Sequence, residues 1–432
     1  MVWSILAGLL SITVASGAVL GAALGLTGFI ILYFFADGGT QLGVQAVWNI
    51  FNEFTLTAIP LFILLGDILV VSGLAGDVYK AMAPVFARMR GGLLHTNIAV
   101  CTVFGAVSGS SISVAALAGS VAYPELTKRG YDRGAVVGSL AGGGTLGLLI
   151  PPSLSLLIYG AITETSIGRL FLAGVVPGLT AAALFMIWIW WSATRNPALA
   201  PEEPPTIRLG RALLGMLRIW PLLILIAAVL GTLFAGVATP TEAAGAGVAA
   251  AMLVGFFFGS LTLRKLGEAL MSTVKTFAVI AVVFMGAIIL AQSISVLGLP
   301  QQLLRVVADL GIPPLAMLAL VVLIYLGLGC LFDGLSMMIM TLPVVFPLLT
   351  GLGYDPIWLG VVVTIMIEVG MLTPPVGMNL FVLVGISGNR VSLGEAARAA
   401  LPYWIALMSL VATMVVVPGL ATGLPDLVMG KR

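Results

Sequence analysis

Residues 146–160 read LGLLIPPSLSLLIYG, and the two adjacent prolines in this apolar run decide how the segment can fold. Proline lacks the backbone N–H of a helical residue and its ring clashes with the preceding turn, so a helix cannot run undisturbed through Pro151 and Pro152. A break inside a lipid bilayer leaves backbone groups without partners, and each such group is costly in hydrocarbon. The run therefore predicts a broken membrane helix, and the break calls for a functional reason.

The composition indicates an all-α polytopic membrane protein. Of the 432 residues, 60% are hydrophobic and 8% are charged, whereas soluble domains carry about 25% charged residues. The opening MVWSILAGLLS has no basic region and no small-residue cleavage site, so we expect a first span rather than a removed signal. The net charge of +2 points to no nucleic-acid partner. The lipid bilayer is the expected surrounding.

Several apolar segments reach the length of about 20 residues that a membrane span requires. They lie at 4–35, 54–75, 135–162, 170–192, 219–237, 241–261, 276–298, 357–387 and 400–424. Two further stretches, 93–127 and 313–350, are too long for one span and short for two, and each has a polar interruption at its middle. These two stretches need a different explanation.

Basic residues indicate that the stretch 93–127 enters and leaves the membrane on one side. They flank it at both ends: Lys80, Arg88, Arg90, Lys128, Arg129 and Arg133. Because Lys and Arg concentrate on the cytoplasmic side, both ends lie inside and the stretch is predicted to be a re-entrant helical hairpin. The same rule places the N-terminus in the cytoplasm and the C-terminus in the periplasm. Four basic residues then lie outside: Arg169, Arg305, Lys431 and Arg432.

The chain repeats itself. Gly130-Tyr131-Asp132 recurs as Gly353-Tyr354-Asp355, an offset of 223 residues (353 minus 130), and Pro151-Pro152 recurs at the same offset as Pro374-Pro375. An odd number of crossings separates the two copies, so we expect them to be inverted in the membrane. Inverted repeats with broken helices at mid-depth are typical of secondary transporters. The second hairpin, 313–350, then opens from the opposite face.

Each hairpin tip carries residues suited to meet its own helix break. The first tip reads SGSS at 108–111, and Asp333 in the second tip takes the position of Ser110. Hydroxyl groups and unwound carbonyls supply the oxygen ligands that hard cations take, so each tip with its break is a candidate cation site. Two simpler alternatives stay open: the prolines could kink packed helices, and Asp333 could cap the helix that follows it. Glu368 and Asp67 are further membrane acids of ambiguous role.

Five motifs together resemble the large membrane subunit of TRAP (tripartite ATP-independent periplasmic) transporters, the DctM-like permeases. They are SGSS at 108–111, KRGYD at 128–132, GLLIPPSLSLLIYG at 147–160, SIGRLFLAGVVPG at 166–178 and GMLTPPVG at 370–377. The resemblance extends over nearly the whole chain. It implies a multi-pass protein of the bacterial inner membrane that imports an organic anion, typically a carboxylate, driven by sodium (Na+) as the coupling ion.

The resemblance also implies a mechanism and partners. A mobile transport domain that holds both hairpins would slide against a static scaffold, as in an elevator. A small four-helix membrane subunit and a periplasmic substrate-binding protein would be separate chains. The expected organisation is scaffold helices in 1–92, a first transport half in 93–165, connecting scaffold helices in 166–312, a second transport half in 313–390 and a C-terminal helix in 391–432.

Two sodium sites are carried over from the family. The first comprises Ser108, Ser110, Ser111, Gly147, Ile150 and Pro152. The second comprises Gly329, Gly370, Thr373 and Val376. Asp333 and the Thr373 hydroxyl are added on physical grounds, and most of the other residues would act through backbone carbonyls.

Two other functions compete with this interpretation. A stand-alone sodium/anion symporter of the same broad architecture would differ mainly in needing no binding protein. A membrane-embedded enzyme would need paired acids or a histidine beside a nucleophile, and the chain has a single histidine and offers no such set. We therefore expect a transporter and no catalytic residues.

Overall fold

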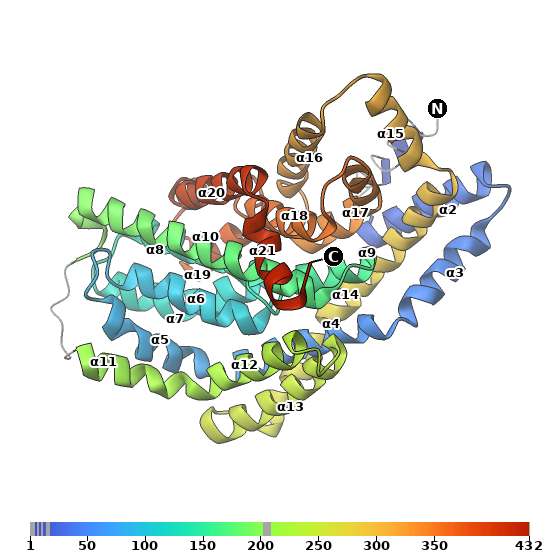
Figure 1. The fold of residues 1–432 in the computed structure, drawn as a ribbon. Coiled ribbons are helices and arrows are strands. Elements are labelled where there is room, and N and C mark those ends of the chain that lie inside the picture. The colour runs from blue at the N-terminus through green and yellow to red at the C-terminus, as the bar shows by residue number, and fades with distance from the viewer. Residues whose placement is uncertain (1–4, 7, 10–11, 14–17, 202–208, 432) are drawn as a thin grey trace.

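The computed structural model describes residues 5–6, 8–9, 12–13, 18–201 and 209–431, and Figure 1 shows this part of the chain as a body of packed helices. Eight helical segments among the described residues are long and apolar enough to cross a membrane. They are Phe54–Val71, Arg133–Thr163, Ile167–Arg195, Leu214–Phe234, Pro240–Phe258, Leu263–Val296, Gly334–Gly351 and Leu393–Val416. The predicted all-α class with many spans is confirmed at this level.

The first half of the chain runs from α2 to α10. Its helices are α2 (Leu20–Phe35), α3 (Thr40–Phe51), η1 (Phe54–Thr57), α4 (Ala58–Val71), α5 (Leu74–Phe86), α6 (Leu93–Ser108), α7 (Ser111–Lys128), α8 (Arg133–Leu149), α9 (Leu154–Thr163) and α10 (Ile167–Arg195). Three further elements lead into the second half: η2 (Pro197–Leu199), α11 (Leu209–Met216) and η3 (Leu217–Ile219).

The second half runs from α12 to α21. Its helices are α12 (Trp220–Phe234), α13 (Pro240–Phe258), α14 (Leu263–Val296), α15 (Leu299–Asp309), α16 (Pro314–Gly329), α17 (Gly334–Gly351), α18 (Pro356–Met371), α19 (Met378–Ile386), α20 (Leu393–Val416) and α21 (Gly419–Met429).

Both predicted helix breaks are present. Helix α8 ends at Leu149 before the Pro151-Pro152 pair, and α18 ends at Met371 before Pro374-Pro375. The peptide bond within each proline pair is cis. Each pair removes two helical N–H donors in succession, so the helix stops before it and starts again a few residues later.

Both apolar stretches of about 35 residues form helical hairpins. In hairpin 1 (α6 and α7) the turn is made by Gly109, which has a φ of +60°, and by Ser110, which caps α7. In hairpin 2 (α16 and α17) the turn spans residues 330–333, and Asp333 caps α17. Figure 1 shows hairpin 1 in cyan beside α8 and hairpin 2 in orange toward the other end of the molecule. Their re-entry from one membrane face stays a prediction.

The internal repeat extends to the helix boundaries. Helix α7 (Ser111–Lys128) shifted by 223 residues coincides with α17 (Gly334–Gly351), and α8 and α18 start at equivalent positions. Their N-caps, Asp132 and Asp355, both accept backbone N–H groups of the first helical turn. The matching Gly-Tyr-Asp motifs are thus matching helix starts.

Several segments differ from the sequence-based expectation. The amphipathic helices α3, α5, α11 and α15 were not expected, because they are shorter than a span and mix polar with apolar positions. The predicted C-terminal helix in 391–432 is two helices, since Pro418 has no N–H to continue α20. The predicted first span, 4–35, falls partly outside the described residues; α2 accounts for its second half.

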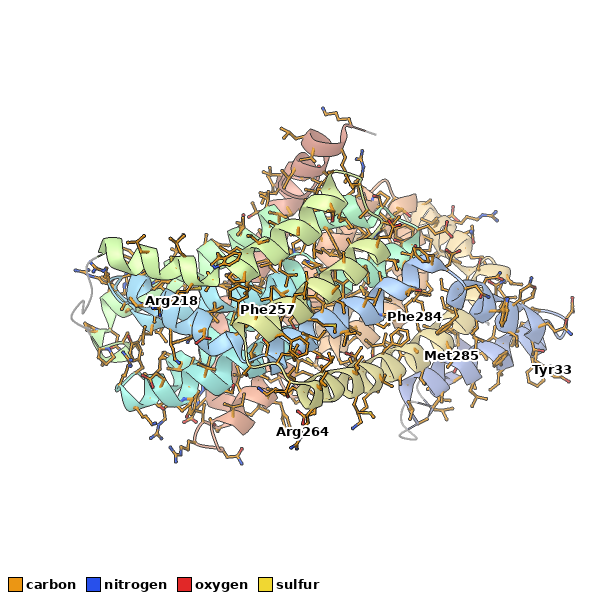
Figure 2. All side chains as sticks on the ribbon, turned by 90° about the horizontal axis from the view of Figure 1, so that it is seen from below. Tyr33, Arg218, Phe257, Arg264, Phe284 and Met285 are labelled. Carbon is orange, nitrogen blue, oxygen red and sulfur yellow. The ribbon has the colours of Figure 1, made fainter. Side chains whose placement is uncertain are left out.

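The two helices that precede the breaks lie at the centre of the fold. All residues of α8 from Val136 and all of α18 from Ile357 are buried. The outer face is formed by α2, α13 and α14, where α2 approaches α14 closely enough that a Cβ on Gly25 would lie 3.3 Å from the Cα of Gly286. Figure 2 shows Phe257 on this apolar outer face, where its side chain is 78% exposed. Such a surface suits lipid tails or a partner helix.

Candidate cation site at the helix breaks

The first break creates carbonyl groups that lack helical donors. In a continuous helix the N–H groups of residues 151 and 152 would bind the carbonyls of Gly147 and Leu148, but both residues are prolines. The Leu148 carbonyl accepts instead from the hydroxyls of Ser153 and Ser155. The Gly147 carbonyl receives no such donor from the break. It is therefore available for a ligand.

The tip of hairpin 1 covers this break. The Leu154 N–H donates to the Gly109 carbonyl at 3.4 Å. A Cβ added to Gly147 would lie 3.0 Å from the Ser110 carbonyl oxygen, and one added to Gly109 would lie 2.9 Å from that of Pro152. Of the residues predicted for the first sodium site, Ser110, Gly147 and Pro152 thus come together through their backbones.

The other predicted residues of the first site make contacts with other helices. Ser108 packs with its backbone against Gly66 of α4. Ile150 caps α8, and its side chain packs on Gly178 of α10, so Ile150 can contribute only a carbonyl. The Ser111 hydroxyl donates to Glu368 of α18 at 3.0 Å.

The second break contacts hairpin 2 through two glycines. A Cβ on Gly329 would lie 2.5 Å from the Cα of Gly370, so the end of α16 and the end of α18 touch backbone to backbone. The Thr373 hydroxyl donates to the Val369 carbonyl at 2.7 Å and accepts from Trp404 Nε1 at 3.1 Å. Val376 lies in the break, and no hydrogen bond among the described residues joins it to hairpin 2.

The two breaks differ in accessibility. Every residue from Ile150 to Ser153 is buried, whereas Pro374 and Pro375 are exposed and Thr373 is half-buried. The second break therefore lies at the surface of the chain. The first break is covered by its hairpin and by the neighbouring helices. The two equivalent sites therefore differ in burial: the first is buried and the second is partly exposed.

Asp333 acts as a helix cap. Its carboxylate accepts the Ser336 N–H at 3.1 Å, as the Ser110 hydroxyl accepts the Ser113 N–H in hairpin 1. This geometry favours the capping alternative over a ligand role for the carboxylate.

We expect Asp333→Asn to leave the sodium activation of uptake unchanged, because asparagine caps a helix as well as aspartate does. Asp333→Ala should lower the free energy of unfolding by about 1 kcal/mol, the usual cost of a lost N-cap. Thermal unfolding and sodium titrations of both variants would check this. A weaker sodium response in Asp333→Asn would instead make the carboxylate an ion ligand.

A buried polar cluster connects the two halves of the chain. The sequence did not predict that its residues would meet. Glu368 of α18 and Asn379 of α19 are both 0% exposed, and both bind the Ser111 hydroxyl. One turn earlier on α18, the Thr364 hydroxyl lies 3.2 Å from that of Ser155 in α9. Spacing offered no signal for these contacts, because Glu368 and Ser111 are 257 residues apart.

The possible ion ligands in this region are mainly neutral oxygens. Within the described residues, no group of three His, Cys, Asp or Glu side chains could hold a metal ion. Backbone carbonyls and hydroxyls at the two breaks suit a weakly held monovalent cation better than a tightly bound transition metal. Together with two broken helices and two helical hairpins, this donor set defines the class of secondary transporters.

The family model "Tripartite ATP-independent periplasmic transporter, DctM component" matches residues 7–420. This chain therefore belongs to the DctM family and is a TRAP transporter large permease subunit, not an enzyme.

Similar proteins agree with this assignment. The "C4-dicarboxylate TRAP transporter large permease protein DctM" of Pseudomonas aeruginosa is 33% identical over 409 residues, which cover 94% of each chain. The "Sialic acid TRAP transporter large permease protein SiaM" of Vibrio cholerae is 30% identical and covers 91% of each chain. Among solved structures, the YdaH transporter of Alcanivorax borkumensis has a TM-score of 0.61 over 91% of each chain at 17% identity, which shows a shared fold.

Proposed function

We propose that sodium drives this permease subunit and that one ion binds at each helix break. The observation that carries the proposal is Gly147, whose carbonyl has no helical donor and whose backbone packs against the Ser110 backbone of hairpin 1. Carbonyl oxygens from a broken helix and a hairpin tip can replace the water of a hard cation without a buried formal charge. The contact of Gly329 with Gly370 gives the second break an equivalent frame.

The transported solute is an organic anion with a carboxylate group. Support comes from the similar proteins, whose names specify C4-dicarboxylates and sialic acid. The family description is of a tripartite periplasmic system. Accordingly, a periplasmic binding protein delivers the solute and a small four-helix membrane subunit completes the complex in the inner membrane. The N-terminus lies in the cytoplasm and the C-terminus in the periplasm.

Transport proceeds by an elevator movement. Hairpins 1 and 2 pack against the buried helices α8 and α18, which supports one mobile body made of both hairpins and both broken helices. Helices α2, α4, α13 and α14 pack mainly on one another, and this layer meets the hairpins where α4 contacts α6 and α14 contacts α17. That layer is the static scaffold, and its exposed apolar face suits lipid and the small subunit.

Uptake by proteoliposomes tests this function. The chain is reconstituted with its small subunit, and uptake of a labelled C4-dicarboxylate or labelled sialic acid is followed with and without the cognate binding protein. We expect uptake only with an inward sodium gradient and the binding protein together. Uptake driven by a proton gradient alone would overturn sodium coupling. Substantial uptake without the binding protein would favour the stand-alone symporter.

A further inference from the structure

Glu368 is a fully buried acid whose carboxyl group is only half satisfied. Its Oε2 accepts the Ser111 hydroxyl at 3.0 Å, and the backbone of Leu148 lies near the carboxyl group, but the buried Oε1 has no hydrogen-bond partner of acceptable geometry. Asn379 donates its amide N–H to the same Ser111 oxygen at 2.8 Å, which leaves Asn379 Oδ1 buried without a partner as well. Glu368 Oε1 and Asn379 Oδ1 are thus two acceptor oxygens without a hydrogen-bond donor, and both side chains are bound to the same Ser111 hydroxyl.

The internal repeat does not account for this cluster. At the offset of 223 residues, Glu368 corresponds to Thr145, whose hydroxyl bonds the Gly142 carbonyl of its own helix. Asn379 corresponds to Leu156, and Ser111 corresponds to Gly334. The first break thus has an acidic neighbour from the other half. At the repeat-equivalent positions the fold has a threonine, a leucine and a glycine instead, so the repeated architecture does not require this acid, amide and hydroxyl.

The chemistry of the cluster fits a monovalent cation. A buried carboxylate without a counter-charge is strongly unfavourable, and buried acceptor oxygens without donors add to the cost. Carboxylate, amide and hydroxyl oxygens are the ligands that hard cations take. One monovalent cation neutralises the single carboxylate, whereas a divalent ion would leave a net positive charge in a buried position.

We propose that Glu368, Asn379 and Ser111 bind one additional sodium ion between the two halves, beside the first helix break. Because the Ser111 hydroxyl is engaged by Glu368 and Asn379, Ser111 can offer only its backbone carbonyl to the ion at that break. Glu368 Oε1 and Asn379 Oδ1 are its side-chain ligands, and Ser111 holds both in place. That the ion is sodium rests on the function proposed above. The carboxylate would give this position a stronger electrostatic hold on the ion than the uncharged donor sets at the breaks.

Equilibrium binding of radioactive sodium to the purified chain tests this site directly. Glu368→Gln keeps the size of the side chain and an oxygen for the Ser111 hydroxyl, so the variant should fold well. We expect it to bind one ion fewer per chain than the unaltered protein. Asn379→Leu introduces the residue found in the other repeat and should weaken the same ion at least tenfold.

Asp67→Asn is the matched control. Asp67 is also a membrane acid, but its carboxylate accepts the Thr273 hydroxyl of α14 at 2.9 Å in the scaffold layer. This variant should bind as many sodium ions as the unaltered chain.

The outcomes separate this site from the broader function. If the unaltered chain binds no sodium, the proposed coupling ion itself is wrong. If it binds sodium and Glu368→Gln binds the same number with the same affinity, only the additional site is overturned. In that case the carboxyl group is held protonated, which the glutamine reproduces. Unchanged binding in Asn379→Leu would also contradict the site.

Discussion

Gly329→Val is expected to weaken sodium binding about 5- to 150-fold, the equivalent of the 1–3 kcal/mol that an overpacked contact costs. The reason is the backbone contact between α16 and α18, where even a Cβ on Gly329 would lie 2.5 Å from the Gly370 Cα. A backbone atom cannot rotate away as a flexible side chain can. The second break would therefore be forced apart from hairpin 2. Sodium-dependent uptake and sodium binding both measure the effect.

The control for this substitution lies on the same helix. Gly327 is in α16, and nothing would come within 4 Å of a Cβ added there. Gly327→Val should leave uptake and sodium binding unaltered. Equal losses in the two variants would mean that α16 is merely intolerant of valine, and normal sodium binding in Gly329→Val would remove Gly329 and Gly370 from the second site.

Ser111→Leu is expected to lower both stability and sodium affinity. The Ser111 hydroxyl is the donor to Glu368 and the acceptor for Asn379, so leucine would leave both buried side chains without their shared partner. An unsatisfied buried group costs about 1–3 kcal/mol and a charged one more, so the free energy of unfolding should fall by about 3 kcal/mol or more. Thermal unfolding with and without sodium measures it.

Ser120→Leu is the matched control on α7. The Ser120 side chain is exposed and its hydroxyl bonds only the Leu117 carbonyl of its own helix. Its replacement by leucine should change stability little, since surface substitutions usually lie within about 0.5 kcal/mol. If Ser111→Leu proves as harmless as Ser120→Leu, then Ser111 supports neither the proposed ion sites nor the Glu368 cluster.

The helix breaks and hairpins were predictable because they follow from local backbone chemistry. Pro151-Pro152 and Pro374-Pro375 stop a helix wherever they occur, and Gly109 in hairpin 1 adopts the left-handed conformation that glycine tolerates. The common offset of these motifs then identified the repeat.

Other features depend on contacts between distant segments and could not be predicted in this way. Glu368 alone appeared ambiguous, because its meaning depends on Ser111 and Asn379 meeting it in space. The role of Asp333 likewise needed the geometry of its bond to the Ser336 N–H. Helix α15 was missed because its short amphipathic pattern resembles neither a span nor a loop.

Helix α18 belongs to the second half in sequence but is hydrogen-bonded to the first half through Thr364 and Glu368. A displacement of hairpin 1 relative to α18 would break the Ser111–Glu368 bond, and a displacement of α9 relative to α18 would break the Ser155–Thr364 bond, both inside the core. These bonds tie the two breaks to each other. Under the proposed elevator movement the two breaks would move as one unit, and the proposed sodium ions would travel together, so the sodium-to-solute ratio would follow from the architecture.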